Sequence, residues 1–332
     1  MQLTDRSAPI YVAGHRGLVG SAVVRALRAA GYDNLIVRTH AELDLLDRAA
    51  VDAFFAAERP AFVVLAAAKV GGILANATYP ADFLGDNLGI ALNVIEAAHE
   101  AGVGQRGRLV FLGSSCIYPR LAPQPIREEH LLTGPLEATN RAYAVAKIAG
   151  LELAESFHVQ HGADFVSLMP TNLYGPGDNF DLAGSHVLPA LVRKMHEAKG
   201  ASPGGADAPV TVWGTGTPRR EFLHADDLAD AVRHVLEQPE ARLRAAAPNG
   251  LFNVGVGEDV EIRELTELVR EVVGSTSEIV HDLSKPDGTP RKLLDVSRMA
   301  ALGWTARTPL RDGLASTYAW FLGHVAHPAE AA

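Results

Sequence analysis

The sequence predicts an α/β fold, namely a doubly wound parallel sheet followed by a smaller C-terminal α/β lobe. Short runs of continuously apolar residues alternate with longer amphipathic runs through the first half of the 332 residues. A glycine-rich turn joins the first apolar run to the first amphipathic run, and after residue 175 the alternation becomes irregular. Strands that are apolar throughout and separated by helices indicate a parallel sheet with both faces covered.

The first half supplies five strands and four helices in alternation. Strands are expected over 9–14, 34–39, 61–68, 108–115 and 164–175. Helices are expected over 18–31, 47–60, 87–102 and 142–162, the first ending at a glycine and the second at a proline. Because crossovers between parallel strands are right-handed, these units build a doubly wound sheet.

The second half has shorter elements. Helices are expected over 185–198, 226–238 and 262–274, and strands over 210–214, 251–255 and 278–282, with a Gly/Pro/Ala-rich loop over 199–209. We expect residues 1–175 to form the nucleotide-binding domain, with 220–248 returning to it. The substrate-binding lobe would then comprise 176–219 and 249–332.

Composition excludes several classes of protein. The net charge of −9 argues against a general nucleic-acid binder, and no uncharged apolar run is long enough for a membrane span. The start, MQLTDRSAPI, lacks a basic segment followed by an apolar one, so we expect no secretory signal. A single cysteine excludes an internal disulfide and favours a cytoplasmic protein. No HExxH, paired CxxC or acidic cluster predicts a metal site.

The glycine-rich turn is the first candidate site. Gly14, Gly17 and Gly20 are spaced GxxGxxG between the first strand and the first helix, which is the arrangement of a Rossmann-type dinucleotide site. Glycine permits close approach of the backbone to a pyrophosphate, and the helix N-terminus supplies amide donors. The predicted cofactor loop therefore consists of Gly14, His15, Arg16, Gly17, Leu18, Val19 and Gly20.

Two arginines favour NADP(H) over NAD(H). An acid at the end of the second strand would hold the free 2′-hydroxyl of NAD, but here Arg38 stands at that place, and Arg16 lies in the glycine loop. Guanidinium groups suit a 2′-phosphate. The alternative is that both arginines are solvated surface residues.

A tyrosine and a lysine predict a site of proton transfer. Tyr143 and Lys147 are four residues apart on a predicted helix and so share one face. An ammonium beside a phenol is expected to lower the pKa of the phenol. The preceding strand ends in Ser114 and Ser115, either of which can bind a substrate carbonyl. YxxxK also occurs by chance, but its position after the fourth strand favours the functional interpretation.

The glycine loop, the strand-end serine and YxxxK together resemble the extended short-chain dehydrogenase/reductase superfamily. Within it, the chain resembles the GDP-L-fucose synthases. Ten segments carry that resemblance: AGHRGLVGSA, VLAAAKVGGILAN, TYPADF, LGSSCIYP, MPTNLYGP, DNF, SHVLPAL, REFLH, SKPDGTPRKLLD and LASTYAWF. The resemblance implies conversion of GDP-4-keto-6-deoxy-D-mannose to GDP-L-fucose, by epimerisation at carbons 3 and 5 and then reduction of the 4-keto group by NADPH. It also implies a homodimer that forms through two helices of each subunit.

The resemblance assigns the catalytic residues. Cys116, in LGSSCIYP, and His186, in SHVLPAL, would be the acid–base pair of the epimerisation. Ser114, Tyr143 and Lys147 would serve the reduction. Which of the cysteine and the histidine is the base at each carbon stays open, as does the order of the two epimerisations. Without the motifs, a lone cysteine is more often a small buried hydrophobic residue, and most of the 13 histidines must be structural.

Further binding residues follow from the same matching. At the ends of the fourth and fifth strands and beyond, the expected cofactor contacts are Leu112, Gly113, Ser114, Ser115, Lys147, Pro170, Thr171, Asn172, Leu173 and His186. The expected contacts of the sugar nucleotide are Lys194, Trp213, Arg220 and Asp287. Trp213 would otherwise be a core residue, and Arg220 a partner in a surface ion pair. The chain departs from the family at Arg141 and Ala142, where an acid and a proline are usual, which puts the local positioning of Tyr143 in doubt.

Two other functions are compatible with the same fold. One is an NAD-dependent nucleotide-sugar epimerase or dehydratase that regenerates its cofactor within each turnover. The other is a non-catalytic protein that senses NADP. Net oxidation of NADPH in the presence of the keto sugar distinguishes the epimerase-reductase from both.

Overall fold

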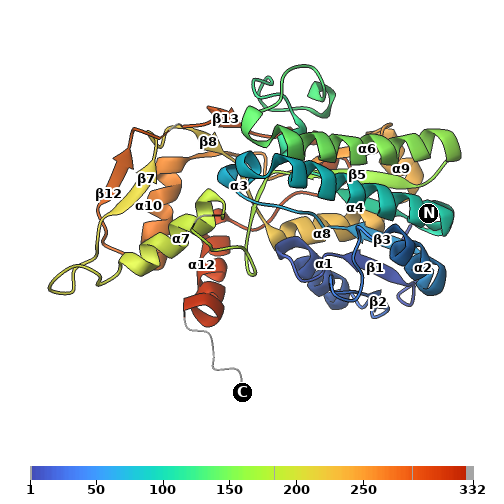
Figure 1. The fold of residues 1–332 in the computed structure, drawn as a ribbon, viewed down its shortest axis with the longest axis horizontal. Coiled ribbons are helices and arrows are strands. Elements are labelled where there is room, and N and C mark those ends of the chain that lie inside the picture. The colour runs from blue at the N-terminus through green and yellow to red at the C-terminus, as the bar shows by residue number, and fades with distance from the viewer. Residues whose placement is uncertain (1, 183, 286, 327–332) are drawn as a thin grey trace.

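A six-stranded parallel sheet forms the core of the larger part of the molecule in the computed structural model, which describes residues 2–182, 184–285 and 287–326 (Figure 1). The strand order is β10-β5-β4-β3-β1-β2, so the chain winds outward from β1 in both directions. The strands are β1 (Ile10–Ala13), β2 (Leu35–Ile36), β3 (Phe62–Leu65), β4 (Leu109–Leu112), β5 (Phe165–Pro170) and β10 (Leu251–Val254).

Helices cover both faces of this sheet because its strands are apolar on both sides. In β1, Tyr11 and Ala13 pack into one core while Ile10 and Val12 pack into another. The first core is closed by α2 (Arg48–Glu58), α4 (Pro80–Glu100) and α6 (Arg141–His161), and the second by α1 (Leu18–Ala29) and α8 (Ala225–Leu236). Shorter helices are α3 (Ile73–Thr78), α5 (Val103–Arg106), α9 (Glu240–Ala246) and α11 (Ser297–Ala301).

The second half of the chain forms a lobe with its own core. In this lobe α7 (Val187–Ala198), α10 (Ile262–Val273) and α12 (Leu310–Phe321) pack around β7 (Val210–Trp213) and β12 (Ile279–Asp282). Short strands form two further small sheets. One contains β11 (Val260–Glu261), β8 (Arg219–Arg220) and β13 (Arg291–Lys292), and the other pairs β6 (Asn172–Tyr174) with β9 (Phe222–His224).

The structure confirms the predicted fold class and corrects some details. The single strand expected over 164–175 is divided into β5 and β6, and β6 leaves the central sheet to pair with β9. Helix α4 begins at Pro80, seven residues earlier than expected, because proline fits the first turn of a helix. Residues 251–254, expected in the substrate-binding lobe, instead form the edge strand β10 beside β5.

Among the residues that the structure describes, none of the helices has the length and apolar character required to traverse a lipid bilayer.

Candidate active site

The turn between β1 and α1 is built around two glycines that the fold itself requires. Gly14 has a φ of +85°, and a Cβ on it would lie 2.8 Å from the backbone of Ala67. A Cβ on Gly20 would lie 2.1 Å from the carbonyl oxygen of Gly14. Gly17 differs, since its φ is −79° and its Cβ would meet only that same oxygen, at 3.5 Å. The space beside Gly17 is therefore not occupied by protein.

The N-terminus of α1 is open to an anion. Gly17 is its N-cap, no side chain caps the helix, and its first turn carries no acidic residue. The first amide groups and the positive end of the helix dipole are thus free to bind a phosphate. Together with the space at Gly17, this arrangement fits the pyrophosphate of a dinucleotide.

Arg38 lies two residues beyond β2, where the 2′-phosphate site was predicted. Its guanidinium forms an ion pair with Glu58 of α2, donates to the carbonyl of Val37 at 2.8 Å, and lies 5.5 Å from the ring centre of Phe54. Arg16, the second predicted arginine, is exposed in the glycine loop. The structure therefore places Arg38 at the expected strand end and gives it a carboxylate partner that the sequence analysis did not foresee.

The predicted cofactor contacts after β4 and β5 lie at one edge of the sheet. Because these strands are parallel neighbours, their carboxyl ends bring 112–115 next to 170–173. The amide of Gly113 donates to the carbonyl of Leu168 at 2.9 Å, and the side chain of Asn172 donates to the carbonyl of Glu221 at 2.8 Å. These contacts hold the two segments in place at the carboxyl edge of the sheet.

Tyr143 and Ser114 are hydrogen-bonded to each other at this edge of the sheet. Tyr143 is in the first turn of α6, and the ring of Phe83 packs edge-on to it with centroids 6.5 Å apart. Burial raises the pKa of Tyr143 above its usual value, the neighbouring Cys116 raises it further, and a hydrogen bond with Ser114 acts in the opposite direction. The phenol is therefore neutral near pH 7 and can act as a proton donor.

Lys147 lies one turn further along α6, and its charge is held by the backbone. Its ammonium donates to the carbonyl of Leu112 at 2.9 Å and lies 5.8 Å from the ring centre of Tyr143. Burial lowers the pKa of Lys147 to about 8, so it remains mostly protonated at pH 7. The sequence predicts that this lysine lowers the pKa of Tyr143, but burial of the phenol raises that pKa instead.

Cys116 lies in the short helix η1 (Ser115–Ile117), immediately beyond the strand-end serines. The hydroxyl of Ser114 is the N-cap of this helix and accepts a hydrogen bond from the Cys116 amide at 3.2 Å. The thiol is partly exposed, and the ammonium of Lys292 donates to its sulfur at 3.6 Å. The thiol, the hydroxyl and the phenol of Tyr143 therefore face one site.

His186 approaches this site from the second lobe. His186 is the N-cap residue of α7. The loop before it is held by a hydrogen bond from the amide of Gly72 to the carbonyl of Gly184, at 3.0 Å. The imidazole keeps exposed surface but is surrounded by protein, so desolvation lowers its pKa, and the Lys292 cation lowers it further. The Lys292 cation that contacts Cys116 therefore also acts electrostatically on His186.

The four predicted substrate contacts lie in the second lobe. Arg220 of β8 is partly buried, and its neighbour across the small sheet is Lys292. Trp213 is 60% exposed with Lys285 5.5 Å from its ring centre, so the core-packing alternative is wrong. Lys194 donates to the carbonyl of Thr211 at 3.1 Å. The two carboxylate oxygens of Asp287 accept from the amide and hydroxyl of Thr215, at 2.7 and 2.9 Å.

The sequence motifs do not predict a role for Lys292 or Glu58. Lys292 lies in SKPDGTPRKLLD, but nothing in its spacing connects it with a cysteine 176 residues earlier. Glu58 is an ordinary acid on an amphipathic helix. Both contacts depend on how distant elements pack.

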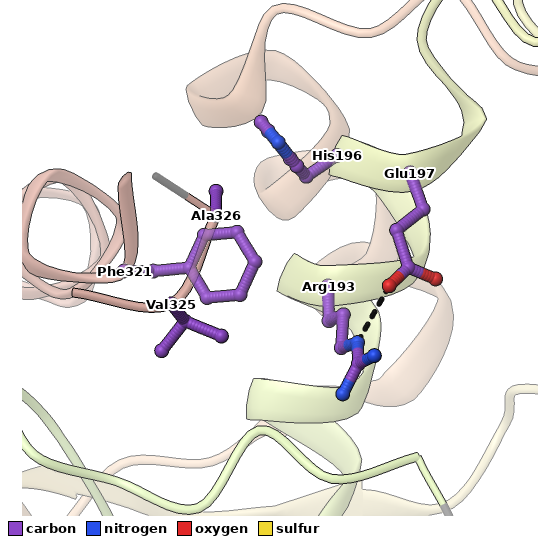
Figure 2. A pocket seen from close by; sticks show the side chains of 6 residues that line it. All are labelled: Arg193, His196, Glu197, Phe321, Val325 and Ala326. Carbon is purple, nitrogen blue, oxygen red and sulfur yellow. Dashed lines mark hydrogen bonds and ion pairs between the residues drawn. The ribbon is translucent and has the colours of Figure 1, made fainter. Parts of the chain in front are cut away.

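A separate cavity of about 400 Å³ lies between α7 and the C-terminal end of α12 (Figure 2). Its wall includes Arg193 and Phe321, and Arg193 is paired with Glu197 at 2.6 Å. None of the predicted site residues lines this cavity, so we do not assign it to the candidate active site.

Comparison with known proteins identifies relatives over nearly the whole chain. The sequence profile of the NAD dependent epimerase/dehydratase family matches residues 10–255. The chain is 57% identical over 325 residues to GDP-L-fucose synthase 1 of Arabidopsis thaliana, covering 97% of this chain and 96% of that protein. It is 55% identical over 316 residues to GDP-L-fucose synthase of Escherichia coli strain K12, covering 94% and 96%.

A solved structure extends the likeness to three dimensions. It is MlghC, a GDP-mannoheptose C4 reductase from Campylobacter jejuni with NADP bound, which superposes with a TM-score of 0.86. The two chains are 37% identical, and the match covers 96% of this chain and 100% of the reductase.

Proposed function

The chain belongs to the NAD dependent epimerase/dehydratase family and, within it, to the GDP-L-fucose synthases, and on this premise we propose how its residues carry out the reaction. The protein converts GDP-4-keto-6-deoxy-D-mannose to GDP-L-fucose with NADP(H) as cofactor. Besides this kinship, the observation that carries the proposal is the convergence of Ser114, Cys116 and Tyr143 on one site, where the Lys292 cation contacts Cys116 and lowers the pKa of His186.

The 4-keto oxygen of the sugar binds between Ser114 and Tyr143. Both hydroxyl groups can donate, and the hydrogen bond between them brings both within reach of one carbonyl oxygen. Polarising this carbonyl acidifies the protons on carbons 3 and 5, because the negative charge that remains after deprotonation moves onto the oxygen. One oxygen site therefore serves both the epimerisation and the reduction.

Cys116 and His186 exchange the protons at carbons 3 and 5. Epimerisation requires a base to remove a proton from one face of the ring and an acid to return one to the other face. The thiol comes from the nucleotide-binding half and the imidazole from the second lobe, so the two residues approach a bound sugar from different elements. Both side chains can gain or lose a proton near neutral pH.

Reduction at carbon 4 ends at Tyr143. NADPH, held by the glycine loop and by the predicted arginines Arg16 and Arg38, supplies the hydride when it is bound. Tyr143 gives its proton to the resulting alkoxide, and its raised pKa keeps that proton in place until the alkoxide forms. Lys147 provides a positive charge beside the phenol and stabilises the phenolate that is left.

Lys194, Trp213, Arg220 and Asp287 form the proposed site for the GDP portion. The exposed face of Trp213 offers a surface for stacking, and the two cations suit the diphosphate. Asp287 accepts two hydrogen bonds from Thr215 and so positions the turn that follows Trp213.

Turnover of the keto sugar tests the proposal directly. The purified protein is incubated with GDP-4-keto-6-deoxy-D-mannose and NADPH, the loss of NADPH absorbance is followed, and the product sugar is identified by NMR. We expect stoichiometric oxidation of NADPH and GDP-L-fucose as the product. Formation of a sugar without net oxidation would point to the cofactor-regenerating epimerase or dehydratase instead, and absence of turnover would point to the NADP sensor.

Two variants separate the half-reactions. We expect Cys116→Ser to abolish epimerisation at carbon 3 but to keep the reduction of an already epimerised intermediate. Tyr143→Phe should lower NADPH oxidation by about two to four orders of magnitude, the usual contribution of a general acid, while solvent deuterium still enters carbons 3 and 5. Normal fucose formation in the first variant, or normal NADPH consumption in the second, would remove that residue from its assigned role.

We further propose that the protein is a homodimer formed through the outer surfaces of α4 and α6. These two helices pack side by side, and apolar side chains on them are exposed, namely Leu92, Val145 and Val159. Light scattering should give twice the subunit mass, and Val145→Glu with Val159→Glu should reduce it to that of a monomer. A parent protein that is monomeric at micromolar concentration would contradict the proposal.

A cytoplasmic location is consistent with this chemistry. The only cysteine of the chain is Cys116, and its proposed role requires a free thiol. A reducing compartment keeps it in that form.

A further inference from the structure

Lys292 is not among the predicted site residues, but it contacts one of them across the boundary between the two halves of the molecule. Its ammonium donates to the sulfur of Cys116 at 3.6 Å, although the two residues are 176 positions apart. Lys292 ends β13 of the second lobe, and β13 lies beside β8 (Figure 1). Cys116, in contrast, follows β4 of the central sheet. The contact therefore depends on the two halves being correctly packed.

The backbone around Lys292 is fixed on both sides. The next residue, Leu293, donates its amide to the side-chain oxygen of Gln124 at 2.8 Å, and Leu294 donates to the buried carboxylate of Glu221 at 3.1 Å. The lysine side chain is half-buried, so few other conformations are open to it. These contacts hold the ammonium close to the sulfur.

No carboxylate among the described residues forms an ion pair with Lys292, so its charge acts on the site itself. The groups that face Cys116 are Tyr143 from α6, which stays protonated, and Ser114, which accepts from the Cys116 amide. His186, at the start of α7, is disfavoured as a cation by the same lysine. Lys147 is directed to the carbonyl of Leu112 instead. Lys292 is thus the one cation in contact with the sulfur in the described structure.

We propose that Lys292 is a positioning residue whose ammonium holds the sulfur of Cys116 as a thiolate, so that the base of the epimerisation is formed before substrate arrives. The thiol proton leaves to solvent, the lysine keeps all three of its own protons, and the site gains a thiolate–ammonium pair. An opposite charge within about 4–6 Å favours the ionised form of such a group. Only the use of the thiolate in epimerisation depends on the proposed function, since the pair itself exists without substrate.

The single cysteine makes this testable without turnover. Iodoacetamide reacts with the thiolate, and in this chain it can modify only Cys116. The rate of alkylation is measured against pH for the ligand-free full-length protein, with Cys116→Ser as the blank. We expect Lys292→Met to lower the rate of alkylation at pH 7 about tenfold and to move the profile toward higher pH.

Two further variants serve as controls. Lys292→Arg keeps the charge and should restore most of the alkylation rate. Lys199→Met removes a lysine of the same lobe that donates to the carbonyl of Val273, and it should leave the profile unchanged. Circular dichroism and NADPH binding establish that each variant is folded.

The outcomes are distinct. A Lys292→Met profile identical to that of the parent would overturn the proposal, even if turnover were lost, because the lysine would then act on the sugar nucleotide instead. Equal loss in Lys292→Met and Lys292→Arg would overturn it too, because the charge would not be the cause. A shifted profile in a protein that never turns over the keto sugar would support the thiolate–ammonium pair and reject the proposed function.

Discussion

Asp178 shows how a single carboxyl can make the stability of the protein depend on pH. It lies in the loop after β6, where one oxygen accepts from the amide of Asn179 at 2.7 Å and the other is buried without a partner in the described structure. Burial raises its pKa to about 7. Between about pH 4, where an unfolded aspartate ionises, and pH 7, the native state therefore holds a proton that the unfolded state has lost. Stability must fall as the pH rises through this window.

We expect Asp178→Asn to remove that loss. The variant keeps an oxygen acceptor but carries no charge, so its advantage over the parent should be small at pH 4 and reach up to about 3 kcal/mol above pH 7. Denaturant unfolding of the ligand-free protein at pH 4.5 and 8 measures the difference, with the exposed neighbour Asp181→Asn as the control. An advantage of the same size at both pH values would show that the charge is not its origin.

At the same scale, we expect Arg38 and Glu58 to influence the preference for NADPH over NADH. Arg38→Ser should weaken NADPH binding about tenfold or more, because a charge-assisted contact to the 2′-phosphate is lost, and should leave NADH binding almost unchanged. Glu58 competes for the same guanidinium. A half-exposed pair of this kind is worth at most about 1 kcal/mol, so Glu58→Gln should tighten NADPH binding by no more than about fivefold. Titration by fluorescence measures both, and weaker NADPH binding in Glu58→Gln would contradict this view of the pair.

At the scale of elements, different glycines of the β1–α1 turn are required by the fold and by the cofactor. Gly17→Ala should leave the melting temperature close to that of the parent, because its Cβ meets only one protein atom at 3.5 Å, but should weaken NADPH binding about tenfold or more. Gly20→Ala should destabilise the protein itself, because its Cβ would overlap the carbonyl of Gly14. Thermal melts and NADPH titrations of the two variants should differ in this way, and equal melting temperatures would show that the turn can relax.

The elements also show what the sequence can predict. Strands β1, β3, β4 and β5 follow from apolar runs, and α1, α2 and α6 from their periodicity, because these elements are defined by local pattern. The two-residue strands β8 and β13 were not foreseen, since such short strands carry no periodic signal. Motifs of consecutive residues predict the individual residues of the site. They do not predict the contact of Lys292 with Cys116, because that contact depends on the short strand β13.

At the scale of the whole molecule, Glu221 ties the two halves together. Its buried carboxylate accepts from the amides of Val256 and Gly257, both at 2.7 Å, and from that of Leu294 at 3.1 Å. The first two amides follow β10 of the central sheet, and the third lies two residues beyond Lys292. One side chain therefore sets the relative placement of the nucleotide-binding sheet and the segment that carries the lysine.

Glu221→Gln should disturb both stability and the site. The carboxamide presents one acceptor in place of two, so at least one buried amide loses its partner at a cost of about 1–3 kcal/mol. We expect a lower denaturation midpoint together with slower alkylation of Cys116 at pH 7, since the lysine is less firmly held. If the midpoint falls and the alkylation rate does not, Glu221 supports the fold without positioning Lys292.

The edge strand β10 has a consequence for how this protein is made. It ends at Val254 of 332 residues, so a ribosome must synthesise most of the chain before the last strand can join β5. Until then the nascent polypeptide exposes an unsatisfied strand edge, which is a template for association with other chains. A fragment truncated after residue 175 would retain that open edge permanently, and we therefore expect it to be recovered in inclusion bodies rather than as an autonomous dinucleotide-binding module.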